Sequence, residues 1–155
     1  MGKRQSWENG AILKIKMNDE CFCYGQMLTH ENCEMAFYDS RTTKAFELSE
    51  ITNLPVLFRV AVHKSAYNTG RWQKIGKAEI PEDLLEPRET YIEDKISGKY
   101  QIYKLGQIRP ARKEECIGLE CCAVWDPNHV EDRLNDFYEG RQCIWCDEFW
   151  RTESR

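Results

Sequence analysis

The chain has 155 residues, of which 41% are hydrophobic and 12% aromatic, so it is long and apolar enough for one folded domain and lacks the composition of a disordered protein. Its formal net charge of -4 is uneven, because residues 1–77 carry +3 and residues 78–155 carry -7. The acidic half argues against nucleic acid as its direct partner, since phosphate binding needs a basic surface, and it is compatible with a basic protein partner.

Alternating and apolar segments predict a mainly antiparallel sheet over the first two thirds of the chain. Residues 11–17 alternate apolar side chains with two lysines, and residues 21–28 continue the pattern after a polar turn, which predicts a hairpin. Residues 56–62 form a nearly continuous apolar segment interrupted by Arg59, so we expect a buried strand with a paired charge on one face. Further strands are expected at residues 34–39, 72–80, 89–94 and 99–106.

The segment WDPNHVEDRLNDFYEG, residues 125–140, predicts an amphipathic helix. Asp126 suits the N-cap, Pro127 the first helical position and Gly140 the position after the last turn. Apolar residues recur along one side of this helix, namely Val130, Leu134, Phe137 and Tyr138. Shorter helical turns are expected within residues 48–53, 81–87 and 110–120.

These elements predict an α+β fold. The sheet is expected to be mainly antiparallel and twisted, or to curl into a small, partly open barrel, with the C-terminal helix packed on it. No repeat, low-complexity segment or long linker divides the sequence, so we expect a single domain over residues 1–155.

The polar side of the predicted helix is the first candidate site. His129, Asp132 and Asp136 lie opposite the apolar side, and an imidazole with two carboxylates can ligate a divalent metal. A useful metal site needs further ligands and a shaped cavity, which the sequence does not supply. A solvent-facing or protein-facing surface is therefore the preferred interpretation.

The segment CIWC places Cys143 and Cys146 in a C-x-x-C pattern, which suits a redox pair or half of a zinc site. Cys121 and Cys122 are the nearest further candidates for zinc, but adjacent cysteines are poor tetrahedral partners and no second C-x-x-C exists. We expect buried thiols that act as small hydrophobic side chains, with a zinc site involving Cys143, Cys146 and Cys121 as the lesser hypothesis.

Two further functional classes remain open from the residues alone. A cysteine hydrolase needs a Cys–His pair, and the chain holds candidates for both members, although no motif orders them. These candidates are Cys116, Cys121, Cys122, His30, His63 and His129. The segment GRWQKIGK can stack a base in a small RNA-binding barrel, but Trp72 is better explained as a core residue. We expect no enzymatic activity.

The expected compartment follows from what the N-terminal sequence lacks. No segment approaches the about 18 apolar residues of a membrane-spanning helix, and MGKRQSWENG has no apolar segment typical of a secretory signal. We expect a cytoplasmic protein with no membrane partner, whose eight cysteines are reduced. The opening also fits the short, weakly specific M-G-x-x-x-S pattern of N-myristoylation.

Several motifs occur together in a recognisable order. They are FYD (37–39), PVLFRVAV (55–62), GRWQKIG (70–76) and EECIGLECCAVWDPNHVEDRLNDFY (114–138). This ordered set resembles the immunity protein 26 family of bacterial polymorphic-toxin systems. The resemblance covers residues 10–138 and leaves the Cys- and Trp-rich tail, residues 141–155, outside it.

The resemblance implies a protein that binds a secreted toxin domain in the cytoplasm and blocks it without chemistry or a cofactor. It supplies no catalytic residues. Residues that match the family pattern are expected to be structural, namely Trp72, Glu120, Trp125, Asp132 and Arg133. Among them, Arg133 is expected to form an ion pair with Asp132 or Glu120 that orients the helix.

The resemblance and the acidic C-terminal half together suggest where the toxin binds. Nuclease toxins are often basic, and an acidic inhibitor can mimic the phosphates that they bind. We expect contact through the polar face of the helix, namely Asp132, Asn135, Asp136 and Glu139, with the acidic segment at residues 81–94 as an equal competitor. The alternative function is a zinc-binding module or a small-barrel nucleic-acid-binding module.

Overall fold

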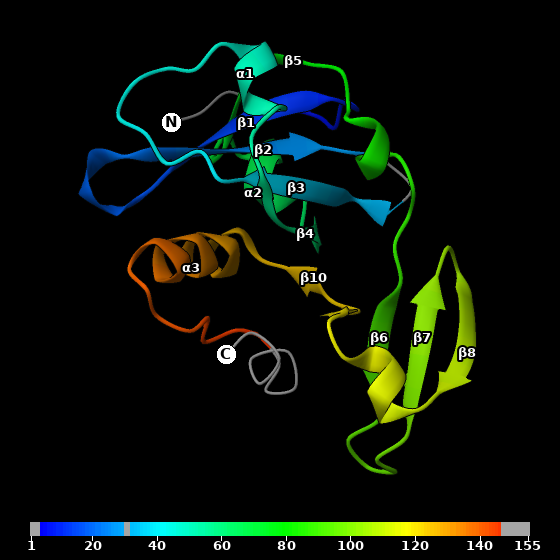
Figure 1. The fold of residues 1–155 in the computed structure, drawn as a ribbon. Helices are drawn as coiled ribbons and strands as arrows, with labels where there is room; N and C mark the ends of the chain where they lie inside the picture. Colours follow the sequence, from blue (N-terminus) through cyan, green and yellow to red (C-terminus); the bar gives the residue numbers. More distant parts are fainter. Residues whose placement is uncertain (1–3, 30–31, 147–155) are drawn as a thin grey trace.

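The computed structural model describes residues 4–29 and 32–146, and within them a six-stranded sheet faces the helix α3 (Figure 1). The strands of this larger sheet are β1 (Ala11–Lys16), β2 (Phe22–Met27), β3 (Glu34–Tyr38), β4 (Val56–Val62), β5 (Gln73–Lys77) and β10 (Val124–Trp125). Their spatial order is β10-β4-β3-β2-β1-β5. All neighbours pair antiparallel except β10, which runs parallel to β4.

A second sheet of four strands stands to one side of the first (Figure 1). Its strands are β6 (Thr90–Glu93), β7 (Tyr100–Lys104), β8 (Gln107–Ala111) and β9 (Glu120–Cys121), in the order β8-β7-β6-β9. The strands thus divide into two sheets, a division that the sequence did not indicate. The chain between β5 and β6 leaves the edge of the larger sheet, so β6 and β7 pair with each other as a separate hairpin.

The remaining elements are short, apart from α3. They are α1 (Leu48–Ile51), α2 (Ser65–Asn68), α3 (Pro127–Tyr138), and the 3₁₀ turns η1 (Asn18–Glu20), η3 (Glu82–Leu84) and η4 (Lys113–Cys116). The α+β class is confirmed, and neither sheet closes into a barrel because each ends in edge strands. Among the described residues, no helix is long and apolar enough to cross a membrane.

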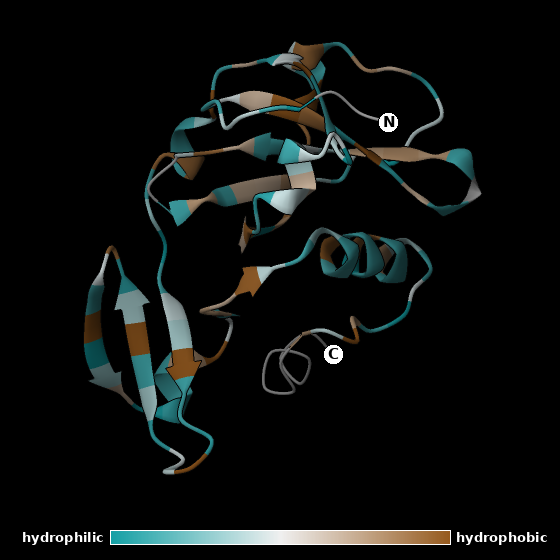
Figure 2. Cartoon of the chain, turned by 180° about the vertical axis from the view of Figure 1, so that it is seen from behind, coloured by the Kyte–Doolittle hydropathy of each residue, from teal (hydrophilic) through white to brown (hydrophobic). Residues whose placement is uncertain are grey.

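The larger sheet carries a separate apolar cluster on each face, because successive side chains of a strand point to opposite sides. Leu13 and Ile15 of β1 pack into the cluster that also holds Val130 and Leu134 of α3. Ile12 points the other way, into a cluster covered by α1 and η3. Figure 2 shows the resulting contrast between the apolar strands and the mostly hydrophilic α3.

The helix α3 begins and ends where the sequence predicts. Asp126 has the extended backbone of an N-cap, Pro127 follows it, and Gly140 adopts a positive φ of 73° after the last turn. Val130 and Leu134 are fully buried, as expected. Phe137 is 53% exposed, contrary to the predicted apolar side, whereas its neighbour Tyr138 packs against the core cluster.

Candidate functional site

The polar face of α3 forms one wall of a hollow of about 430 Å³. Asp132, Asn135 and Asp136 line this hollow together, facing the start of η1 across it. The Oδ1 atom of Asn135 accepts a hydrogen bond from the backbone N–H of Asn18 at 3.3 Å. Glu139 is exposed and lies outside the hollow, so three of the four expected contact residues share one site.

The expectation that Asp136 is exposed is wrong, since only 6% of its surface is accessible. The chain reverses after Gly140, and the backbone N–H of Arg141 donates to the Asp136 carbonyl at 2.8 Å. The Arg141 guanidinium then donates two hydrogen bonds to Asp136 Oδ1, at 3.0 and 3.2 Å. Asp136 therefore anchors the tail of the chain on the helix.

Cations from other segments balance most carboxylates around this hollow. Glu131 accepts two hydrogen bonds from Arg71, at 2.6 and 2.8 Å, and Glu139 forms an ion pair with Arg141. Asp132 has no ion-pair partner among the residues that the structure describes. The face is thus mixed in charge, whereas the sequence indicated a one-sided acidic surface.

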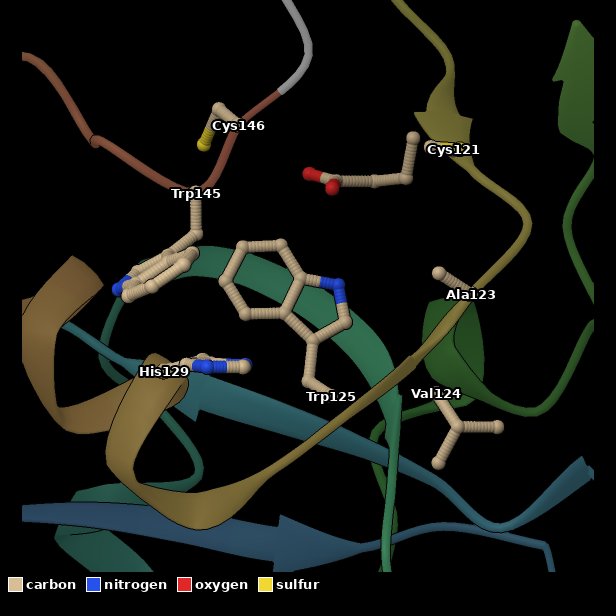
Figure 3. A pocket seen from close by; sticks show the side chains of 8 residues that line it. Cys121, Ala123, Val124, Trp125, His129, Trp145 and Cys146 are labelled. Carbon is tan, nitrogen blue, oxygen red and sulfur yellow. The ribbon is translucent and has the colours of Figure 1, made fainter.

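The tail also contacts the two other residues of the hypothetical metal site, and Figure 3 shows one of these contacts, that of Trp145 with His129. The ring of Trp145 stacks on His129 with centroids 4.1 Å apart, and its Nε1–H donates to Asp132 Oδ2 at 2.8 Å. Among the described residues, no three His, Cys, Asp or Glu side chains are placed to hold a metal ion. The polar face of α3 is therefore in part a packing surface for the tail.

A buried ion pair joins α3 to β9. Arg133 donates from Nη1 and Nη2 to the two carboxylate oxygens of Glu120, at 3.0 and 2.7 Å. The same guanidinium lies 3.9 Å from the ring centroid of Phe58 and 5.1 Å from that of Trp125. The expected pairing of Arg133 with Glu120 is confirmed. The Arg133 guanidinium also faces two aromatic rings in addition to the Glu120 carboxylate.

Trp72 is a core residue and not an exposed platform for a base. Its side chain is fully buried, its ring meets Phe37 edge-on at 5.7 Å, and its Nε1–H donates to Glu131 at 2.8 Å. The same Glu131 binds Arg71, so the GRW segment is tied to α3. A nucleic-acid base therefore cannot stack on Trp72, as the RNA-binding alternative would require.

The cysteines of the tail lie in the core beside the Arg133–Glu120 pair. Cys143 and Cys146 are 8% and 6% exposed, and both belong to the apolar cluster between the larger sheet and α3. Cys146 also lines a hollow of about 210 Å³ together with Cys121 and Trp125 (Figure 3). Burial of these thiols agrees with the preferred interpretation of the sequence.

The two described histidines contact groups other than a cysteine thiol. His63 Nδ1 lies 2.9 Å from Ser65 Oγ, and His129 stacks on Trp145. His30 lies outside the described residues, as do residues 147–155 of the tail. The geometry therefore adds no support to a cysteine hydrolase.

Sequence reasoning missed a third feature, a cleft of about 680 Å³ between the two sheets. One wall holds Glu34, which is 8% exposed and accepts hydrogen bonds from Arg59 Nε at 2.9 Å and Arg88 Nε at 3.1 Å. The paired charge expected at Arg59 is thus confirmed. Glu34 and Arg88 are 54 residues apart, so no local pattern could have indicated that they meet.

A comparison with protein-family models now decides the family. The model described as immunity protein 26 matches residues 8–102, which is more than half of the chain. The chain belongs to the immunity protein 26 family. No curated protein and no solved structure matches it.

Some of the candidate residues lie inside the immunity protein 26 match and others lie after it. It spans the strands from β1 into β7 and includes Trp72, whereas Glu120, Trp125, Arg133 and the polar face of α3 follow it in the chain. The polar face of α3 therefore lies on a segment that the family model does not cover, whereas the competing acidic segment at residues 81–94 lies within the match.

Proposed function

We propose that this chain is a non-catalytic immunity protein that binds and neutralises a cognate bacterial toxin domain in the cytoplasm. Membership of the immunity protein 26 family carries the proposal. The geometry of the described residues supports it, since the candidate site offers a polar, mixed-charge surface to a protein partner. We further propose that residues 1–155 form a single immunity domain.

We place the toxin contact on the polar face of α3. Asp132, Asn135 and Glu139 reach the surface there, while Asp136 acts indirectly by holding Arg141 and the tail in place. Asp132 is the carboxylate of this hollow without an ion-pair partner among the described residues, which leaves its charge available to a basic partner. A nuclease toxin is the class that this chemistry fits, because such enzymes present basic surfaces to phosphates.

A second acidic surface competes for the same role. Glu82, Asp83 and Glu86 are exposed in and after η3, which covers the opposite face of the larger sheet. Because the two surfaces lie on opposite faces, a toxin domain that contacts one is not expected to contact the other. Charge reversal at each surface in turn therefore separates the two hypotheses.

The test is calorimetric titration against the toxic C-terminal domain of any large secreted protein that is encoded beside this gene. Tight one-to-one binding with loss of toxin activity is expected. The double variant Asp132→Lys/Glu139→Lys should weaken binding by about 10-fold or more, and the matched double variant Glu82→Lys/Asp83→Lys should leave it unchanged. Circular dichroism of both variants checks that each is folded.

Three results would change these conclusions. Weakening by the second double variant alone would move the interface to the η3 surface. Weakening by neither would remove both acidic surfaces from the interface while leaving the function intact. Absence of binding to a correctly folded and active toxin neighbour would contradict the proposed pairing itself.

A further inference from the structure

A turn brings the two cysteines of the CIWC segment together. Residues 144 and 145 form this turn, so Cys143 and Cys146 occupy its first and fourth positions. The Cα atoms at these positions of a β-turn lie less than about 7 Å apart, which overlaps the range that a disulfide requires. The two thiols lie within hydrogen-bonding reach of each other, and neither sulfur is part of a disulfide.

The two thiols differ in their surroundings. The pKa of Cys143 is lowered to about 7, chiefly by the hydrogen bond from Cys146, with help from the backbone N–H groups of Trp145 and Cys146 and from the charge of Arg133. Donating that hydrogen bond, together with burial, raises the pKa of Cys146. One thiol is thus disposed to ionise near neutral pH while the other keeps its proton, as in a nucleophile and its resolving partner.

We propose that Cys143 and Cys146 form a redox-active dithiol, which a low-molecular-weight disulfide such as glutathione disulfide converts to an intramolecular disulfide. The Cys143 thiolate attacks one sulfur of the reagent, forming a mixed disulfide and releasing one thiol. Cys146 then loses its proton and attacks Cys143 Sγ, which releases the second thiol. The protein loses two electrons and two protons, and the reagent is reduced to two thiols.

Trp145 ties the turn that carries this dithiol to α3. It lies between the two cysteines in sequence, its ring stacks on His129, and its Nε1–H donates to Asp132. Trp145 itself is 45% exposed, so these two contacts are at the protein surface. The thiols are buried when Trp145 is seated, and local opening of this turn is the step that admits the reagent.

The test treats the purified full-length chain with glutathione disulfide, then denatures it, alkylates the remaining thiols and measures its mass. Trypsin is expected to cleave after Arg141 and Arg151, which places both cysteines, and no other, in one peptide. That peptide should lose two hydrogen atoms and resist alkylation until it is reduced. This readout is covalent and needs no toxin, so it is independent of the proposed function.

Variants assign the roles of the two sulfurs. Cys146→Ser should stop at a lasting mixed disulfide of Cys143 with glutathione, because no resolving thiol remains. Cys122→Ser, at an exposed cysteine outside the turn, is the matched control and should leave the internal disulfide unaffected. Trp145→Ala should oxidise several-fold faster than the wild-type chain.

Two outcomes overturn the proposal. The first is a 142–151 peptide that stays fully reduced while exposed Cys122 becomes glutathionylated. The second is zinc bound by the untreated protein, with both thiols protected until the metal is chelated. Since the wild-type peptide alone decides between these outcomes, a variant that fails to fold does not affect the test.

Discussion

At the scale of single residues, buried charges are where one side chain matters most. The side chains of Arg133 and Glu120 are 4% and 11% exposed, so both have lost most of their hydration. Two direct hydrogen bonds and the faces of Phe58 and Trp125 compensate for that loss. Removing one partner leaves the other as an uncompensated buried charge, which costs more than the pair contributes.

We therefore expect Glu120→Ala to lower the free energy of unfolding by about 3 kcal/mol, measured by urea denaturation. The control is Glu89→Ala, which removes an exposed ion pair with Arg109 and should cost less than about 1 kcal/mol. Equal effects of the two substitutions would show that the Arg133–Glu120 pair is not desolvated in solution.

The lowered pKa of Cys143 predicts that the free energy of unfolding depends on pH. Its pKa of about 7 in the folded chain lies below its ordinary value of 9.0, so between these pH values the folded thiol is ionised and the unfolded one is protonated. Unfolding then takes up a proton, and stability rises with pH across this window. Urea titrations of the reduced protein should show the rise, and Cys143→Ser should flatten it; an unchanged slope in the variant would assign the rise to other groups.

At the scale of elements, α3 is covered on two sides by different parts of the chain. The larger sheet covers Val130 and Leu134, and the tail covers His129, Asp132 and Asp136. A buried carboxylate on the polar side stabilises the helix only when another group pairs with it. Arg141 and Trp145 supply these partners, and they reach that side because the chain turns back at Gly140.

The apolar side of α3 gives a matched pair of truncations. Leu134→Ala should lower the free energy of unfolding by about 3 kcal/mol, because Leu134 is fully buried and its removal leaves a cavity. Phe137→Ala should cost less than about 1 kcal/mol, since Phe137 is 53% exposed. Urea denaturation measures both, and a larger loss at Phe137 would place that ring against the sheet.

At the scale of the whole molecule, the two sheets are joined in two ways. The segment from β9 to β10 pairs with both, since Cys122 N–H donates to the Tyr91 carbonyl at 2.8 Å and His63 N–H donates to the Trp125 carbonyl at 2.9 Å. Across the cleft, Arg88 joins Glu34 of the larger sheet just before β6 begins. Burial lowers the pKa of Arg88, and the charge of Glu34 opposes that shift.

Arg88→Ala should therefore loosen the smaller sheet. It removes one of the two cations at buried Glu34 and should cost about 2 kcal/mol in unfolding free energy. Amide hydrogen exchange should accelerate in β6 and β7 more than in β1 and β2, because the lost contact joins the smaller sheet to the larger. Uniform acceleration, or none, would show that the segment from β9 to β10 alone holds the sheets together.

Local patterns predicted the long elements and failed for interactions across the fold. The strands β1 to β5 and the helix α3 follow from side-chain periodicity, which is a property of consecutive residues. The two-residue strands β9 and β10 have no such signal and exist because they meet β6 and β4. The Arg133–Glu120 pair was expected from the family resemblance, whereas the contacts of Trp145 and Arg141 with α3 were not expected at all.

The α+β class, the apolar faces of the strands, the limits of α3 and the immunity protein 26 family all follow from the amino-acid sequence alone. The tertiary structure decided the division into two sheets, the burial of Asp136 and the meeting of Glu34 with Arg88. This difference arises because the interactions act over different distances along the chain. Periodicity and capping act within a few residues, while ion-pair partners and burial depend on which distant segments the folded chain brings together.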